Sequence, residues 1–384
     1  MSGIDHQELR EGVRKVCAQF PDAYWRELDA RRAYPEEAVE ALAKAGYLAP
    51  LIPREYGGLG LDIGAASVIL EEINRSGGNA QPAHAQVYTM GTLLRHGSEE
   101  QKRAYLPKIA SGELRLQAFA VTEPEAGTDT TSLRTTAVRD GDHYVVNGRK
   151  MFISRVQYSD LMILLARTTP REEVQRKTEG LSVFLVDLRE AVGNGLEVNP
   201  KRVMINNQTN ELVFTDLRIP ASSLIGEEGK GFRYVLDGMN AERILIAAEC
   251  VGNGRWFIER STARARERVI FGRPIGQNQG IAFPIAKAHV SLEAANLMRI
   301  RAAELFDAGQ PCGAEANMSL MLAAAASWEA AEAAMQTFGG YSYDADYDIE
   351  RKFRETRLFQ VAPISTNLIL SYVAEHVLGL PRTF

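Results

Sequence analysis

The central part of the chain, residues 116–225, is patterned as short β-strands with no helix among them. The candidate strands, rich in β-branched and aromatic residues, are Leu116–Val121, Thr135–Val138, His143–Val146, Lys150–Ile153, Leu161–Arg167, Leu181–Asp187 and Glu211–Ile219. An Asp-Gly pair at 140–141 and an Asn-Gly pair at 147–148 predict hairpin turns. Because helices do not alternate with these strands, a doubly wound parallel sheet is excluded, and an antiparallel barrel or sandwich is predicted.

Helical patterns flank the strand region on both sides. Apolar residues recur every three or four positions in Asp5–Phe20, Pro35–Ala45, Gly64–Ser76, Gln81–His96, Ser98–Ser111, Phe232–Val269, Gly280–Ala308, Ala314–Phe338 and Val361–Val377. Long helices joined by short connections favour a bundle. We therefore predict an α+β chain of three domains: an all-α domain over 1–115, a central antiparallel β-barrel over 116–225, and a C-terminal helical bundle over 226–384.

Composition narrows the class of protein. The 44 Lys and Arg against 49 Asp and Glu give a net charge of −5, without the basic footprint of a nucleic-acid partner. Three scattered cysteines favour a reducing compartment over a disulfide scaffold. From the charged, helix-like pattern of its first residues we expect no secretory signal, and apolar runs such as Leu161–Ala166 are too short to cross a bilayer. We expect a cytoplasmic protein with no membrane partner.

Several common site motifs are missing from the sequence. There is no G-x-G-x-x-G, no Walker loop, no H-E-x-x-H and no G-x-S-x-G. The six histidines are dispersed without ligand spacing, so we expect no metal site. Any cofactor must be held by a less generic arrangement of residues.

One nine-residue segment makes the helix–strand–helix plan specific. Val121–Asp129 reads VTEPEAGTD and resembles the TEP-x-x-GSD signature of the acyl-CoA dehydrogenase family. Further family marks follow the same order along almost the whole chain: Glu55-Tyr-Gly-Gly, Asn147-Gly-x-Lys-Met-Phe-Ile-Ser, Gly229-x-Gly-Phe, Arg268-x-x-Phe-Gly-Arg-Pro and Gln336-x-x-Gly-Gly-Tyr. Each mark is weak alone, but six in order make chance a poor explanation.

The resemblance implies a fold, a cofactor and a reaction. The fold is a helical N-terminal domain, a central β-barrel and a C-terminal four-helix bundle, with FAD between barrel and bundle in a homotetramer. The reaction is α,β-dehydrogenation of an acyl-CoA thioester to the trans-2-enoyl-CoA, with a hydride passing to flavin N5. Electrons would then pass to an electron-transfer flavoprotein.

The resemblance also assigns residues by position. Phe119, Thr122 and Thr128 would line the flavin and substrate cleft, and Thr128 stands at a family serine position near the substrate. Phe152 and Ser154 match a Trp-Ile-Thr segment behind the flavin ring, with an aromatic face and a hydroxyl retained. The remaining nucleotide-binding positions, some of them reaching a neighbouring subunit's FAD, are Arg268, Phe271, Gln279, Gln336, Gly339, Gly340, Ser365 and Asn367.

The reaction demands a base for the α-proton of the thioester. Most of the family carries a glutamate near the C-terminus, but the matching segment Leu358–Ser365 puts Pro363 there, and proline cannot accept a proton. Isovaleryl- and long-chain-type members carry the glutamate on an earlier bundle helix. Glu242 falls at that alternative position and is followed by Arg243, which would orient it or bind substrate.

Helical spacing supports this choice independently. Glu242 lies three residues after Met239 in a largely apolar stripe that also includes Val235 and Ile246. A carboxylate in such a stripe is desolvated, which strengthens it as a base. Without the family pattern, an ion pair between Glu242 and Arg243 would be the plainer interpretation.

Proline at position 363 raises a second question. In the family, the backbone N–H at that position helps to hold the thioester carbonyl, and proline has none. Either Ile364 donates instead, or the enolate is stabilised differently. The alternatives to dehydrogenation are therefore enoyl-CoA reduction, elimination from a substituted acyl-CoA, a flavin monooxygenase reaction, or a catalytically silent binding protein.

Overall fold

The computed structural model describes residues 6–382, which form two compact units. Unit 1 takes in Met1–Arg31, Asp62–Ala80 and Asn240–Phe384, and unit 2 takes in Arg32–Leu61 and Gln81–Met239. The predicted α+β class, with helical N- and C-terminal regions, is confirmed. The three predicted domain boundaries stay a prediction.

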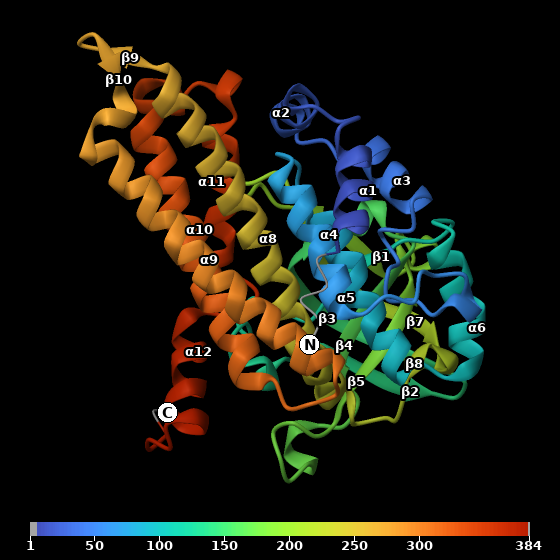
Figure 1. Cartoon of the computed structure of the whole chain (residues 1–384). Helices are drawn as coiled ribbons and strands as arrows, with labels where there is room; N and C mark the ends of the chain where they lie inside the picture. The colour runs from blue at the N-terminus through green and yellow to red at the C-terminus, as the bar shows by residue number, and fades with distance from the viewer. Residues whose placement is uncertain (1–5, 383–384) are drawn as a thin grey trace. The chain divides into compact units, whose positions relative to one another are not determined.

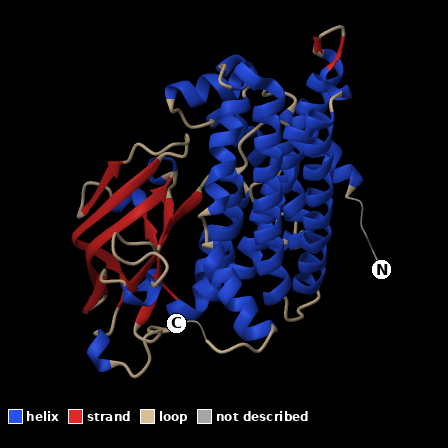
Figure 2. Ribbon diagram, turned by 90° about the vertical axis from the view of Figure 1, so that its left-hand side faces the viewer, coloured by secondary structure: helices blue, strands red, loops and turns tan. Residues whose placement is uncertain are grey.

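Unit 2 contains one eight-stranded sheet (Figure 2). Its strands are β1 Leu116–Ala120, β2 Thr136–Asp140, β3 His143–Ser154, β4 Leu161–Arg167, β5 Leu181–Asp187, β6 Leu196–Pro200, β7 Thr209–Pro220 and β8 Leu224–Ile225. The order is β6-β7-β3-β2-β4-β5-β8, and β1 pairs with β4. The sheet is mainly antiparallel as predicted, but β4 runs parallel to both β1 and β2. Buried side chains such as Tyr144, Phe184 and Leu212 form its core.

The predicted hairpin turn at Asn147-Gly148 is wrong. β3 continues through this pair and stays paired with β7, with a register shift between Val146 and Gly148. Gly148 has a φ of 144°, and a Cβ there would lie 2.6 Å from the Cα of Thr135. Gly148 therefore allows a β-bulge and a close approach of two backbone segments inside a strand, rather than a hairpin turn.

Four α-helices lie wholly in unit 2: α3 Glu36–Lys44, α5 Gln81–His96, α6 Glu99–Ala110 and the single turn α7 Leu188–Ala191. α6 begins with a reciprocal capping box formed by Ser98 and Gln101. The side chain of Gln101 also donates to the backbone carbonyls of Ser222 and Leu224, at 2.8 and 2.9 Å. These bonds fix the helix to the end of the sheet region.

Unit 1 is dominated by long helices that run side by side (Figure 1). They are α8 Gly231–Glu267, whose first residues belong to unit 2, α9 Gln279–Asp307, α10 Gly313–Phe338, α11 Ile349–Arg357 and α12 Thr366–Tyr372. Buried alanines such as Ala323, Ala326 and Ala330 let α10 pack closely. The predicted bundle is therefore present, together with α1 Gln7–Cys17, α2 Asp22–Arg31 and α4 Ile63–Arg75. Asp5, at the predicted start of α1, lies outside the described residues.

The sequence pattern does not predict α11, and the reason is that most of its buried side chains are charged. Arg351 and Lys352 are 2 % and 0 % exposed. They are neutralised by Asp348 and Glu355 and donate to the carbonyls of Gly77 and Gly78. An apolar periodicity cannot reveal such a helix. The predicted C-terminal helix also begins later than expected, at Thr366 rather than Val361.

Over residues 6–382, no helix combines the length and the apolar character needed to cross a membrane.

Candidate active site

The segment after β1 carries two of the predicted cleft residues. Thr122 is half-buried, and its carbonyl accepts a hydrogen bond of 2.9 Å from the N–H of Met151 on β3. Thr128 lies six residues farther on, in the exposed part of the loop. Phe119 on β1 is half-buried, and its ring meets that of Tyr88 on α5 edge-on at 5.1 Å. Unit 2 thus places Thr122 directly beside β3, while Thr128 stands apart.

Phe152 and Ser154 lie on the final residues of β3. Phe152 is 64 % exposed and has a φ of 61°, within a register shift between Lys150 and Ile153. A bulge of this kind re-aims a side chain, and left-handed backbone at a non-glycine residue costs about 1–3 kcal/mol. Strain of this kind clusters at functional sites, so the exposed ring is suited to receive a flat ligand. The Ser154 hydroxyl accepts a hydrogen bond of 3.0 Å from the Asn207 side chain.

Glu242 lies near the start of the unit 1 part of α8. Its side chain is 6 % exposed, so the burial predicted from the helical stripe is confirmed. The neighbouring Arg243 donates from Nη1 to the Asn240 side-chain oxygen at 3.1 Å. Burial lowers the pKa of the Arg243 guanidinium, and the charge of Glu242 opposes that shift. The pair therefore places an acid and a cation together in a largely dry environment.

Three residues around Arg243 complete this cluster. Cys312 and Tyr372 lie near Arg243, and the Asn240 side chain hydrogen-bonds Cys312. Burial raises the pKa of the Cys312 thiol. Asn240 precedes Arg243 by three residues on one helix, and this spacing alone could have indicated from the sequence that their side chains are neighbours. No local pattern marks Cys312 or Tyr372, which come from distant segments.

A second group of predicted residues gathers at the other end of α8. The hairpin of β9 Val269–Ile270 and β10 Arg273–Pro274 carries the fully exposed Phe271, with Arg268 before it and Gln279 at the start of α9. The end of α10 lies here too, because the Arg264 guanidinium covers the rings of Phe338 and Tyr341 at 5.5 and 4.8 Å. Gln336, Gly339 and Gly340 belong to this end.

The predicted nucleotide-binding residues of unit 1 are therefore divided between two places. Arg268 follows Glu242 by 26 residues, which at the rise of an α-helix is about 39 Å. Ser365 and Asn367 lie instead at the start of α12, whose Ile369 shares a core cluster with Ile246, one turn after Glu242. Figure 1 shows the hairpin and α12 at opposite ends of the long helices.

The segment around Pro363 offers one backbone donor. The N–H groups of Val361 and Ala362 both donate to the carbonyl of Leu358 at 3.0 Å. Pro363 has no N–H. The N–H of Ile364 has no acceptor among the residues that the structure describes. Of the two possibilities set out from the sequence, a donor at Ile364 is thus physically open.

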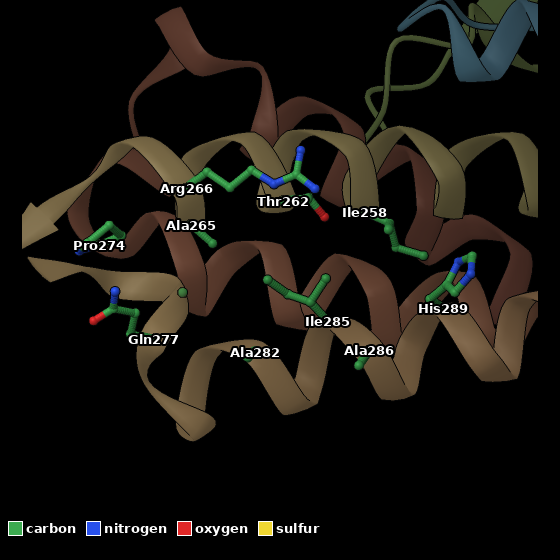
Figure 3. Close-up of a pocket in the computed structure, with 11 residues that line it drawn as sticks. Ile258, Thr262, Ala265, Arg266, Pro274, Gln277, Ala282, Ile285, Ala286 and His289 are labelled. Carbon is green, nitrogen blue, oxygen red and sulfur yellow. The ribbon is translucent and has the colours of Figure 1, made fainter.

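A groove of about 620 Å³ lies between α8 and α9 beside the hairpin (Figure 3). Its walls are mostly apolar and include Ile258, Ala265 and Ile285, with His289 at one end. Within residues 6–382, no three His, Cys, Asp or Glu side chains gather to hold a metal ion. The groove therefore offers a mainly apolar surface.

Comparison with known families decides the identity. Residues 4–113 match the acyl-CoA dehydrogenase N-terminal domain, residues 118–217 the middle domain and residues 229–378 the C-terminal domain. The chain belongs to the acyl-CoA dehydrogenase family. It is an FAD-dependent oxidoreductase, as the resemblance of its motifs implies.

Individual members of the acyl-CoA dehydrogenase family align over almost the full length. An acyl-CoA dehydrogenase of Bacillus subtilis is 35% identical over 97% of this chain and 96% of its own. A 3-(aryl)acrylate reductase of Clostridium sporogenes is 32% identical over 97% of this chain and 98% of its own. The solved structure of a glutaryl-coenzyme A dehydrogenase in complex with glutaryl-CoA superposes with a TM-score of 0.92, at 30% identity, covering 100% and 97% of the two chains.

The residues present in this acyl-CoA dehydrogenase fit an FAD cofactor. A Cβ built at Gly339 or Gly340 would meet no atom within 4 Å, so a nucleotide can approach that backbone. Phe152 presents an exposed ring, and Thr122, whose carbonyl is bonded to the same strand, is half-buried. Ring, hydroxyl and open glycine backbone are the kinds of group that hold a flavin and its nucleotide.

Proposed function

We propose that this protein oxidises an acyl-CoA thioester to the trans-2-enoyl-CoA, with Glu242 as the base that takes the α-proton. The observation that carries the proposal is the burial of Glu242 at 6 % exposure, in a chain whose other family base position is Pro363. Bound FAD supplies the two-electron acceptor. Thr122, Phe152 and Ser154 would hold its ring system.

Each remaining demand of the reaction has a candidate residue in the chain. Glu242 accepts the α-proton and is kept from bulk water by its burial, which strengthens a carboxylate as a base. Arg243 orients the carboxylate and binds substrate, together with Thr128. The N–H of Ile364 supports the thioester carbonyl while negative charge develops on its oxygen.

The test is replacement of Glu242 by Gln in the full chain. We expect E242Q to retain FAD and to lose about 10²- to 10⁴-fold in the rate of anaerobic flavin reduction by an acyl-CoA substrate. Glu249→Gln is the matched control, because Glu249 is also buried on α8, two turns later. Rapid reduction in E242Q would assign the base elsewhere.

A second reaction, enoyl-CoA reduction, is favoured by the reductase among the relatives. Anaerobic titration with a panel of saturated acyl-CoA and enoyl-CoA thioesters separates the two. Bleaching of the flavin by a saturated thioester, with enoyl-CoA formed, supports dehydrogenation. If enoyl-CoA reoxidises dithionite-reduced flavin while no saturated thioester bleaches the oxidised flavin, enoyl-CoA reduction is supported. Rapid oxygen use with NADH supports a monooxygenase. Spectral shifts without bleaching support a catalytically silent binding protein.

The proposal includes a homotetramer and an electron-transfer flavoprotein as acceptor. The hairpin group lies about 39 Å along α8 from Glu242, too far to complete the same ring site. A second copy would bring its own hairpin to this chain's nucleotide and would cover the apolar groove between α8 and α9. Sedimentation velocity of the FAD-loaded protein checks the assembly.

A further inference from the structure

Lys150 is a fully buried lysine on β3, two residues before Phe152. Its side chain is 0 % exposed. Its Nζ donates to the carbonyl of Val121 at 3.0 Å and to the Glu123 carboxylate at 2.9 Å. The two acceptors flank Thr122 on either side. The next residue of β3, Met151, holds the Thr122 carbonyl itself.

Glu123 extends this contact to the far side of the loop. Its carboxylate accepts hydrogen bonds from the backbone N–H groups of Arg134 and Thr135, at 2.6 and 2.9 Å. The backbone of Glu123 also pairs with that of Ala126 in an isolated antiparallel β-bridge, which closes the first part of the loop. One buried ion pair therefore fastens the start and the end of the loop that carries Thr122 and Thr128.

The electrostatics show that this pair is held against a desolvation penalty. Burial lowers the pKa of Lys150 to about 8, although Glu123 opposes the shift. Burial alone would raise the pKa of Glu123, but the charge of Lys150 and the hydrogen bonds from Thr135 and Arg134 hold it below its ordinary value. Buried pairs often add little to stability compared with apolar residues, so stability alone is a weak reason to keep one.

We infer that Lys150 is a positioning residue that, with Glu123, sets the Thr122 segment against the bulged Phe152–Ser154 segment and so shapes the flavin site. The inference rests on the proposed flavin contacts of these two segments. Lys150 belongs to the strand that carries Phe152 and Ser154, and it binds the residues before and after Thr122. Displacing it would move the two segments relative to each other without removing any flavin-contacting side chain.

The test compares three variants of the full chain. Lys150→Met removes the ammonium but leaves the buried Glu123 without its cation, which risks misfolding. The double variant Lys150→Met with Glu123→Gln removes both charges, and its single amide oxygen can still accept from one of the two N–H groups, of Arg134 and Thr135, that the carboxylate binds. Lys352→Met is the matched control, because Lys352 is equally buried and also binds a carbonyl and a glutamate, at 2.8 and 3.1 Å, in unit 1.

We expect the double variant to keep a cooperative thermal transition, to show an altered flavin absorbance band, and to lose about 10- to 100-fold in flavin reduction rate. Lys352→Met should lower Tm and leave the absorbance band and FAD affinity unchanged. A double variant with wild-type absorbance, FAD affinity and reduction rate would overturn the inference. If wild-type protein binds FAD but no thioester reduces it, the proposed function fails, while absorbance and FAD affinity still decide the role of Lys150.

Discussion

Gly148 lies against Thr135 so closely that a Cβ on the glycine would be 2.6 Å from the Cα of Thr135. With a φ of 144°, Gly148 also adopts backbone that side-chain-bearing residues rarely reach. We predict that Gly148→Ala destabilises the protein by about 3 kcal/mol, from overpacking and backbone strain together. Urea unfolding followed by the fluorescence of the folded protein measures this difference.

Gly141 provides the matched control for that substitution. It has a φ of 62° in the turn between β2 and β3, but its Cβ position has no atom within 4 Å. Gly141→Ala should therefore cost only the backbone term, about 1–2 kcal/mol. Equal losses in the two variants would show that the contact with Thr135 contributes nothing.

The same glycine illustrates what a sequence can predict about this fold. An Asn-Gly pair indicates backbone that favours glycine, but such backbone occurs both in hairpin turns and at β-bulges. Only the pairing of β3 with β7 distinguishes them. The long helices were predictable because their apolar stripes repeat over many turns, whereas α11 was not, since Arg351 and Lys352 fill its buried face.

The candidate site divides in a similar way. Family motifs predict Thr122 and Phe152 as site residues, and the family's alternative base position predicts Glu242. These roles stay predictions, whereas the burial of Glu242 predicted from the apolar stripe of α8 is confirmed. Glu123 and Lys150 both lie within family marks, but nothing in the sequence indicates that they form a buried ion pair, because a lysine within a strand ordinarily points to solvent. Cys312 and Tyr372 join Arg243 only through the packing of distant helices.

Acid unfolding should depend on Glu71, which is fully buried on α4 between three arginines. Burial alone would raise its pKa, but Arg299, Arg255 and Arg10 hold it below its ordinary value. A carboxyl with a lowered folded pKa stabilises the protein above its unfolded pKa of about 4.5, and this stability is lost as the pH falls towards the folded value. Unfolding free energy should therefore decline below about pH 4.5.

Glu71→Gln should lower the unfolding free energy at neutral pH by about 3–5 kcal/mol, since it leaves the buried Arg299 without its anion. It should also flatten the acid decline, because one titrating carboxyl is gone. Glu293→Gln is the control: its side chain is 44% exposed and pairs with the same Arg255 at 3.3 Å. A change of less than about 1 kcal/mol is expected there. If the unfolding free energy of the Glu71 variant declined below about pH 4.5 as steeply as that of the wild type, the pH dependence would not come from Glu71.

Arg243 should govern substrate affinity more than FAD affinity. Its guanidinium is buried beside Glu242 and donates to the side-chain oxygen of Asn240. Arg243→Met should weaken acyl-CoA binding about 10- to 100-fold, the value of one hydrogen bond to a charged group. Titration of the flavin spectrum with a non-reacting thioester analogue measures the Kd. An unchanged Kd would leave Arg243 as an orienting partner of Glu242 alone.

Gly340 tests whether nucleotide and backbone approach each other closely at the end of α10. The chain itself has room for a side chain there, with no atom within 4 Å of the Cβ position. Gly340→Ala should therefore leave the Tm of the FAD-free protein unchanged and weaken FAD binding about 10- to 100-fold through overlap with the nucleotide. Loss of FAD-free stability together with affinity would instead indicate a structural role.

Phe271 should connect assembly to cofactor retention. It is 100% exposed at the hairpin tip, where Val269 and Ile270 are also exposed at 55% and 42%. Apolar side chains gathered on a surface mark an interaction site, and an aromatic ring can contribute about 1–3 kcal/mol by stacking on a nucleotide base. Phe271→Ser should therefore weaken FAD binding about 10-fold or more and shift sedimentation towards smaller species.

Val138→Ser is the control for the Phe271 substitution, because Val138 is 60% exposed on β2, in the other unit. It should change neither FAD content nor sedimentation. The two readouts for Phe271→Ser also separate two roles of the ring. Loss of FAD without dissociation would confine Phe271 to nucleotide stacking, and dissociation of a protein that can be reloaded with FAD would confine it to the subunit contact. If Phe271→Ser kept both its FAD and its oligomeric state, the hairpin would have no part in the FAD site.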